Sequence, residues 1–463
     1  MDKDYIQIMA VYCMFVMALI VRNHAVVVDI KTKGAKGDGI TDDSPAILSA
    51  WKEVCGGPPP SSLVIPPGTY MSLAIMLAGP CKGPIEINAK GATLKAPPEL
   101  VKFSKDSWIY IRNVDKLTMI GGTFDGQGQQ TWMGTKCDET MACPVPVNLR
   151  LSNLKNLVLK DLTSINSKNF HLALRGSDNS RLENLVINAP GNSINTDGIH
   201  IAKLNGLNIT NSKIGTGDDC ISFGEGSRNI HIERVSCGPG HGFSIGSLGK
   251  FPNEEPVEGI FLKNCTITGT TNGVRIKTWP NSYPGIVRDI HFEDIIMNGA
   301  QNPVLIDQEY CPNKACKKGA PSKVKLTNVS FKRIRGTSAT KVAVKLVCSA
   351  QVPCENVEVA DIHLTFNGGP ATSECSNAKP KVVGQNVPGW VKGGMVGGGR
   401  RWWEVIGRRR KTVVGTNPTC NSGPPQTPPA TEDGGGYKPT CNSDGDRGSG
   451  GEKGDGDGGG VED

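Results

Sequence analysis

A four-residue phrase recurs along this chain and constrains its fold more than any other feature. Each copy has a polar residue or glycine, then an apolar residue, any residue, and a second apolar residue. Alternating apolar residues are typical of a short strand with one buried face. The smallest step between copies, from Leu185 to Leu207, is 22 residues, which matches one coil of a solenoid, and insertions lengthen the other steps. Nine copies occur: Lys116–Met119, Asn156–Leu159, Asn184–Ile187, Gly206–Ile209, Asn229–Ile232, Gly259–Leu262, Asp289–Phe292, Asn328–Phe331 and Asn356–Val359.

A second strand is predicted in most coils, about fourteen residues after the first. Its leading apolar residues are Ile199, Ile221, Phe243, Val274 and Val304. Helical periodicity is confined to a short segment at 43–54. A leucine-rich horseshoe would need a helix in every repeat and a propeller about 40 residues per blade, so both fit less well. We therefore expect an all-β chain wound as a right-handed parallel β-helix, which also suits its 58 glycines and its 5% of aromatic residues.

The first 25 residues have the pattern of a secretory signal peptide. A polar start containing Lys3 is followed by fourteen apolar residues at 8–21, whereas a bilayer-spanning helix needs roughly 20. We expect cleavage near Ala25, secretion, and no membrane attachment afterwards. Removal of Cys13 leaves fourteen of the 15 cysteines, an even number that suits an oxidising compartment. Three sequons are compatible with glycosylation in that compartment: Asn208, Asn264 and Asn328.

The charge balance indicates the kind of partner. The chain carries a formal net charge of +7, which attracts an anionic partner. Nucleic acid is not expected for a secreted chain. An acidic polysaccharide fits both the charge and the compartment.

Aligning the second strands brings titratable side chains into one register. The residue two positions before the leading apolar residue is Asp197, then Asp219, then His241, and Asp218 precedes Asp219. Parallel strands lie about 4.8 Å apart, so these groups form a column in which like charges raise at least one pKa. Glycoside hydrolysis needs one protonated and one ionised carboxyl group. The alternative is that the aspartates cap turns, which suits a single aspartate better than three in register beside a histidine.

Two cations follow in the next coil. Arg275 and Lys277 alternate with apolar residues and are predicted to point outward on one face, where they could bind the carboxylate of an acidic sugar. The alternative is a pair of solvent-exposed surface cations. Strict alternation would point the column of acidic residues inward, so we expect a bend at Gly198, Gly242 and Gly273 that turns it outward.

Four of these phrases resemble the signature motifs of the polygalacturonases, glycoside hydrolase family 28. They are Asn195–Gly198, Gly217–Asp219, Gly240–Gly242 and Arg275–Lys277, in the family's order and spacing. The similarity runs from about Asp29 to about Gly384, and Asp307–Cys311 and Lys341–Lys345 resemble the plant pollen exopolygalacturonases. It implies a pectin-lyase-like β-helix and an inverting hydrolase of α-1,4-linked galacturonate in pectin, without cofactor or metal.

The resemblance also implies a division of labour among the column residues. Asp218 would be the general acid, and Asp197 with Asp219 would activate water. His241 would keep the carboxylates correctly protonated.

Substrate binding is assigned to a second group by the same resemblance. Arg275 and Lys277 would bind galacturonate, and Tyr310 matches a tyrosine of the family that contacts substrate. Two disulfides are expected from proximity on adjacent coils or across a short loop: Cys220–Cys237 and Cys348–Cys354.

The domain organisation expected from the sequence has three parts. Residues 1–25 are the signal peptide, 26–385 the catalytic β-helix, and 386–463 an atypical extension, expected to be disordered where Gly, Pro and Asp dominate. The extension departs from the family pattern and is either a basic pectin-binding segment or non-native sequence. We expect a monomer.

Other functions remain open at this point. A pectate lyase, a pectin methylesterase and a non-catalytic wall protein or allergen are the rivals of the hydrolase. Exo attack is favoured over endo attack by the resemblance to the pollen enzymes.

Overall fold

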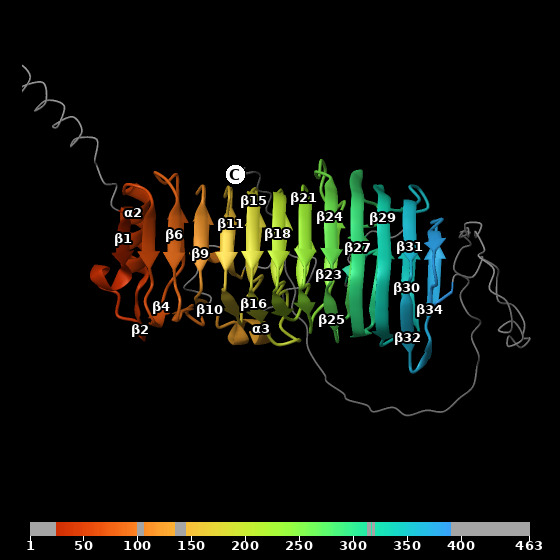
Figure 1. Cartoon of the computed structure of the whole chain (residues 1–463), viewed down its shortest axis with the longest axis horizontal. Helices are drawn as coiled ribbons and strands as arrows, with labels where there is room; N and C mark the ends of the chain where they lie inside the picture. Colours follow the sequence, from red (N-terminus) through yellow and green to blue (C-terminus); the bar gives the residue numbers. More distant parts are fainter. Residues whose placement is uncertain (1–24, 100–105, 135–144, 313–315, 317–319, 390–463) are drawn as a thin grey trace, which may run out of the picture. The chain divides into compact units, whose positions relative to one another are not determined.

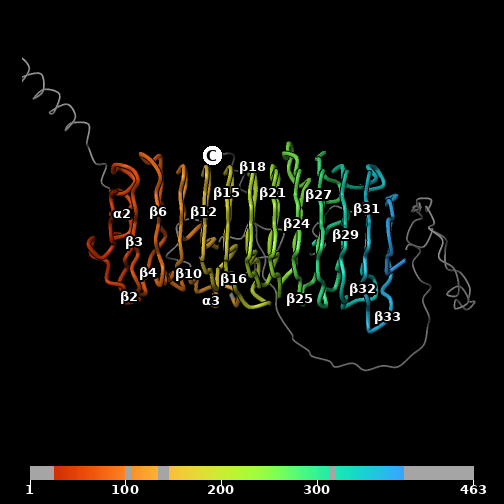
Figure 2. Tube along the Cα trace, viewed as in Figure 1, coloured from red at the N-terminus to blue at the C-terminus, as the bar shows by residue number. Residues whose placement is uncertain are grey.

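The computed structural model describes residues 25–99, 106–134, 145–312, 316 and 320–389, and these form a parallel β-helix with three strands in most coils. Figure 1 shows the coils side by side in chain order, and the Cα trace in Figure 2 follows the same succession. The predicted β-helix is therefore confirmed. The segments 1–24 and 390–463 lie outside the described residues, and so do the signal peptide and most of the extension. No described helix has the length and apolarity of a membrane span.

Strands of successive coils pair in parallel and form three rows. The first row is β1 (Val26–Asp29), β3 (Ser61–Val64), β6 (Ile85–Asn88), β9 (Leu117–Ile120), β12 (Val158–Lys160), β15 (Asp178–Glu183), β18 (Asn205–Thr210), β21 (Arg228–Glu233), β24 (Val257–Lys263), β27 (Gly285–Ala300), β29 (Val324–Ser338), β31 (Glu355–Ala360) and β35 (Lys381–Val383). The second row is β2 (Asp38–Asp42), β4 (Gly68–Met71), β7 (Ala92–Lys95), β10 (Thr123–Asp125), β13 (Thr163–Ile165), β16 (Val186–Asn188), β19 (Lys213–Gly215), β22 (Ser236–Cys237), β25 (Thr266–Thr268) and β32 (His363–Phe366), with β33 (Gly369–Pro370) antiparallel to β32. The long strands β27 and β29 run through both rows and join them into one sheet.

The third row is a separate sheet. It comprises β5 (Ile75–Ala78), β8 (Ser107–Arg112), β11 (Val147–Ser152), β14 (Leu172–Arg175), β17 (Ile199–Ala202), β20 (Ile221–Phe223), β23 (Phe243–Leu248), β26 (Asn272–Thr278), β28 (Asn302–Asp307), β30 (Val342–Val347) and β34 (Thr372–Ser376). Ile199, Ile221, Phe243, Val274 and Val304 are register partners along this row, as the alignment of second strands predicts. This sheet carries the candidate site.

The interior is built from stacked aliphatic side chains. In the first row Leu207, Ile230, Ile260, Ile290 and Val329 are register partners, and all are buried. Full burial of one such side chain contributes roughly 1.5–3 kcal/mol, so each further coil adds stability through contact with its neighbours.

The polar residue that begins each phrase is explained by backbone conformation. The first residue of all nine phrases has a positive φ, from Asn356 at 51° to Gly206 at 82°. Glycine and asparagine tolerate this left-handed region better than most residues. The first residue of each phrase is therefore the turn residue that redirects the chain into the strand.

One of the nine phrases, Asn184–Ile187, does not lie in the first row with the others. The register partner of Leu159 in the next coil is Leu182, not Ile187, so Asn179–Leu182 is the first-row copy there. The copy at Asn184–Ile187 begins the second-row strand β16 instead. Ser180 occupies the position that is apolar in the other copies, and it is buried. A serine at that position conceals the repeat from a search for apolar residues.

Helices and disulfides complete the fold. The predicted helix is present as α2 (Ser44–Gly56), whose apolar face packs against β1, β3 and β5 of the first coils. Shorter helices are η1 (Ile30–Lys33) and α3 (Gln129–Gly134). The expected disulfides Cys220–Cys237 and Cys348–Cys354 are present. Cys55–Cys81 and Cys311–Cys316 are also bonded.

Candidate active site

The column residues stand just before neighbouring strands of the third row. Asp197 precedes β17, Asp219 precedes β20, and His241 precedes β23. Because these strands pair without a shift at their leading residues, the three side chains come from successive coils. Asp218 is the neighbour of Asp219, and one atom each of Asp218, Asp219 and His241 lie within 4.8 Å of one another.

A bend at Gly198 and at Cys220 follows the column residue, whereas Gly273, where a bend was also expected, lies within β26. Cys220, which follows Asp219, is buried and bonded to Cys237, so its side chain points into the helix. At the equivalent position Gly198 has no room for a side chain, because a Cβ there would clash with Ile214. The following residue therefore faces inward, and the acidic residue before it faces the outer surface.

Asp219 is an ionised carboxylate held by cations. Its Oδ1 accepts hydrogen bonds from Ser244 Oγ at 2.7 Å and Arg275 Nη2 at 2.9 Å, and its Oδ2 accepts one from Lys277 Nζ at 3.1 Å. Burial by itself would raise the pKa of Asp219. The charges of Lys277 and Arg275 outweigh burial and lower this pKa to about 2.

Asp197 has the opposite character. It is buried, and its Oδ2 accepts a hydrogen bond of 2.6 Å from Ser222 Oγ. Burial and the charges of Asp218 and Asp219 raise its pKa well above the ordinary value, and the Ser222 bond only partly opposes them. Carboxylates so close together lose their protons in separate steps, so the cluster retains a proton where isolated aspartates would be ionised.

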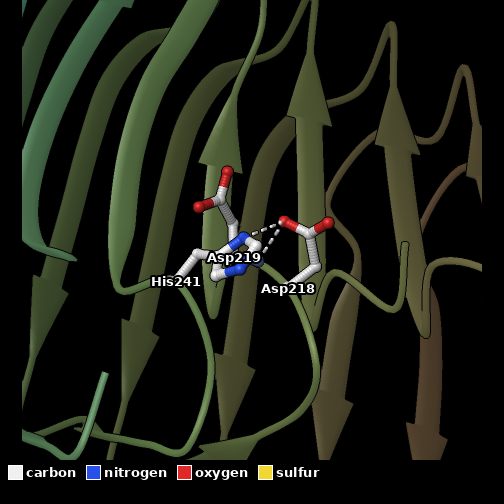
Figure 3. Close-up of side chains that lie close together, drawn as sticks. All are labelled: Asp218, Asp219 and His241. Atoms are coloured by element: carbon white, nitrogen blue, oxygen red, sulfur yellow. Dashed lines mark hydrogen bonds and ion pairs between the residues drawn. The ribbon is translucent and has the colours of Figure 1, made fainter. Parts of the chain in front are cut away.

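Asp218 and His241 form a hydrogen-bonded pair, which Figure 3 shows with the imidazole ring facing the carboxylate. The distance from His241 Nδ1 to Asp218 Oδ1 is 3.0 Å, and the same oxygen accepts the backbone N–H of Asp219 at 2.7 Å. Burial opposes protonation of His241, but the bond and charge of Asp218 prevail and raise the histidine pKa. His241 therefore holds a proton against Asp218.

Arg275 and Lys277 are not the solvent-exposed pair of the alternative interpretation. Each is only 7% exposed, and the Tyr310 ring lies over both, 5.7 Å from the Arg275 guanidinium carbon and 5.0 Å from Lys277 Nζ. Cations at this distance interact with the face of an aromatic ring. The structure thus brings Tyr310, predicted only from the resemblance, together with both cations.

A cavity of about 820 Å³ opens beside this cluster. Asp218, His241, Arg275 and Tyr310 line it, and it extends to Lys345 on β30. One wall is the loop 192–195. Ser180 and Ile199 are 19 positions apart, whereas Leu207 and Ile221, their partners in the next coil, are 14 apart. The extra residues of this coil supply the loop.

Several cavity and cluster residues were not predicted from the sequence. Ser222 and Ser244 bind Asp197 and Asp219, and they are register partners in the outward row that continues to Arg275. The aligned strands contained this signal, since both serines occupy the position of Arg275. Asp307 and Lys345 also line the cavity, but they lie on later coils, outside the four phrases from which the site was predicted.

Three groups of the cluster have the spacing of a metal site, namely Asp218, Asp219 and His241. The carboxylate of Asp219 is already bound by Arg275 and Lys277, whose positive charges repel a metal ion. The donor set therefore favours an ion-paired carboxylate over a metal centre. That no cofactor takes part stays a prediction.

Residues 55–387 match the model of the glycosyl hydrolases family 28. The chain belongs to this family. It is 52% identical over 358 residues to a polygalacturonase of Gossypium barbadense, covering 77% of this chain and 88% of the relative. It is 50% identical over 357 residues to an exopolygalacturonase of Oenothera organensis, covering 76% and 98%. The crystal structure of the endo-xylogalacturonan hydrolase from Aspergillus tubingensis superposes with a TM-score of 0.68 and 24% identity, covering 78% of this chain and all of that one, and has the same fold.

Proposed function

We propose that this family 28 chain is a secreted polygalacturonase of the cell wall, which hydrolyses the α-1,4 bonds of polygalacturonate with inversion and removes galacturonate from the chain end. The observation that carries this proposal is the group of three aspartates and two buried cations beside one cavity. The relatives named above, a polygalacturonase and an exopolygalacturonase, support the substrate and the exo mode. The catalytic unit spans 26–385, acts as a monomer and needs no cofactor.

Asp218 is the general acid in this proposal. It lines the cavity, so its carboxyl can reach the leaving oxygen of a bound chain. His241, with its raised pKa and its 3.0 Å contact to Asp218, keeps a proton available at that carboxyl. Proton donation lets the sugar leave as an alcohol.

Asp197 and Asp219 position and activate the attacking water. A general base works best when its pKa lies near the working pH, and the raised pKa of Asp197 meets this condition. Asp219, kept ionised by Arg275 and Lys277, supplies a second acceptor that orients the same water. The two cations also attract the carboxylate of the substrate.

Replacing Asp218 by asparagine tests the acid. Asp218→Asn keeps the shape but cannot donate the proton, so we expect kcat on polygalacturonate to fall by about 10²–10⁴ with an unchanged thermal midpoint. The assay is release of reducing ends. The matched control is Asp161→Asn, a turn residue outside the cavity lining that accepts a hydrogen bond from Asn184, and it should retain wild-type turnover. Near-normal turnover in Asp218→Asn would refute the assignment.

The exo mode is tested by the products. Monogalacturonate alone, from the earliest time point, is expected from chain-end attack. A ladder of oligomers at early times would establish endo attack instead. The same digest distinguishes the rivals, because a lyase forms unsaturated products and an esterase releases methanol.

A further inference from the structure

The cavity continues beyond the cluster along the third row of strands. Arg275, Leu305 and Lys345 are register partners on β26, β28 and β30, and all three line the cavity. Neighbouring strands are about 4.8 Å apart, which places Lys345 roughly 10 Å from Arg275 along the helix axis. Leu305 lies between the two cations and is largely buried, so the floor there is apolar and suits the face of a sugar ring.

The cations of the cavity differ in how far their charge is already compensated. Arg275 and Lys277 both bind Asp219, so one negative charge is shared between them. Lys345 is partly exposed and forms no ion pair with any residue in the described part of the chain. Lys345 is near enough to Asp307 for its charge to oppose the burial that raises the pKa of Asp307, but no described carboxylate lies within ion-pair distance of it. Its Nζ can therefore still bind a ligand in the cavity.

Two acidic residues at the end of β28, in the same sheet, restrict where an anion can bind. Asp307 and Glu309 line the same part of the cavity. Asp307 Oδ1 accepts the backbone N–H of Glu309 at 3.0 Å, which fixes the carboxylate. These negative charges repel a substrate carboxylate, whereas Lys345 attracts it. A uronate in this part of the cavity is thus oriented with its carboxylate toward Lys345.

We propose that Lys345 binds the carboxylate of a galacturonate unit farther along the chain than the unit held by Arg275 and Lys277. This inference rests on the proposed polygalacturonase function and identifies a further binding residue for the same substrate. Each unit of polygalacturonate carries one carboxylate, and methyl esterification removes its charge. Lys345 therefore makes the enzyme select chains that are unesterified at that distal unit.

The test compares chain lengths. Lys345→Met removes the charge and keeps the length of the side chain, and the substrates are di- to hexagalacturonate. We expect kcat/KM to fall about tenfold on the longer chains, mainly through KM, and much less on digalacturonate. Lys345→Arg should restore most of the loss. Lys341→Met, at an exposed position just before β30 and outside the cavity lining, is the matched control and should behave as wild type.

Esterified substrate gives a second readout. Wild type should prefer unesterified over methyl-esterified oligomers, and Lys345→Met should reduce that preference severalfold. No loss on any chain length, or an equal loss on every length including digalacturonate, would overturn the role of Lys345. Failure of the wild type to release galacturonate from any substrate would overturn the proposed function instead, so the two failures are distinct.

Discussion

Asp197, Asp218 and Asp219 have the same side chain and three different surroundings. Asp219 is bound by two cations, Asp197 is buried with one hydroxyl, and Asp218 pairs with His241. The pKa of Asp219 is lowered and that of Asp197 is raised, although they precede equivalent strands of adjacent coils. The pKa values of Asp197 and Asp219 differ because each carboxylate binds different neighbouring groups.

Removing one cation should release the constraint on Asp219. In Lys277→Met, burial acts against a single remaining cation, so we expect the pKa of Asp219 to rise from about 2 by about one unit or more. The measurement is a carboxyl carbon NMR titration from pH 6 down to the onset of acid unfolding. The wild-type Asp219 signal should stay constant over most of this range, while the variant signal titrates.

The acid limb of the pH–activity profile gives a second measure of the same change. It should move to higher pH in Lys277→Met, since Asp219 must be ionised to orient water in the proposed mechanism. Lys323→Met is a suitable control, because Lys323 lines a different pocket from the one lined by Asp218 and Arg275. Identical titration of Asp219 in the wild type and Lys277→Met would show that Arg275 alone sets its pKa.

The residues of the column could be predicted from the sequence because the 22-residue steps from Asp197 to Asp219 to His241 repeat the coil length. Their environments could not. The hydroxyl that reaches Asp197 comes from Ser222, 25 residues later, and the contact depends on side-chain direction at the bend. Lys345 is outside the predicted site because three strands lie between its strand β30 and β20, although it lines the same cavity as Asp218.

At the scale of elements, the bend before each third-row strand decides which way the chemistry faces. Gly242 follows His241 and has a φ of +84°, and a Cβ there would clash with the carbonyl oxygens of Asn272 and Gly273. The neighbouring backbone therefore approaches too closely for any side chain. Glycine here serves close packing of coils as well as conformation.

Comparing Gly242→Ala with Gly299→Ala should separate the free-energy cost of overpacking from the cost of the backbone conformation. Gly299 also has a positive φ, +71°, but open space surrounds its Cβ position. We expect Gly299→Ala to lower the free energy of unfolding by about 1 kcal/mol from conformation, and Gly242→Ala by about 2 kcal/mol more from overpacking. Urea unfolding measures both.

Activity should distinguish the glycine variants as well. A shift of His241 and Asp218 in Gly242→Ala should lower kcat by about tenfold or more, while Gly299→Ala keeps wild-type turnover. Equal stability losses in the two variants would mean that the Asn272 and Gly273 carbonyls move aside readily.

Strands were predictable wherever the repeat keeps its pattern of a polar residue or glycine followed by two alternating apolar residues. The pattern fails at β15, where Ser180 replaces the apolar residue. A similar phrase leads into β16 instead, in the second row. First-row and second-row strands both follow a turn residue with left-handed backbone, as Asn179 before the first-row phrase and Asn184 before the second-row phrase show. Local sequence cannot assign such strands to a row, because the rows differ only in which coil neighbours they meet.

At the scale of the whole described β-helix, stacking buries histidines as well as aliphatic residues, and this makes stability depend on pH. Burial lowers the pKa of His171 to about 3, and burial with the charge of Arg175 lowers that of His200 to about 4. An unfolded histidine has a pKa near 6.5. Between these values the unfolded state binds more protons, so the contribution of these two histidines to stability is complete above pH 6.5 and is lost as the pH falls toward 4.

The two histidines together predict that the free energy of unfolding decreases by up to about 2.7 kcal/mol per pH unit between pH 6 and 4.5. Asp197 and Asp307, whose pKa values are raised by burial, retain protons in the folded state and offset part of this slope, whereas His291, whose pKa is lowered by burial, adds to it. Asp219 and His241 contribute outside the window, below pH 4 and above pH 6.5 respectively.

Urea unfolding at several pH values gives the slope. His171→Gln should flatten it by about one proton whatever its effect at pH 7, whereas His363→Gln, at an exposed position on β32, should leave it intact. A slope unchanged by His171→Gln would show that this histidine is not the group whose protonation opposes folding.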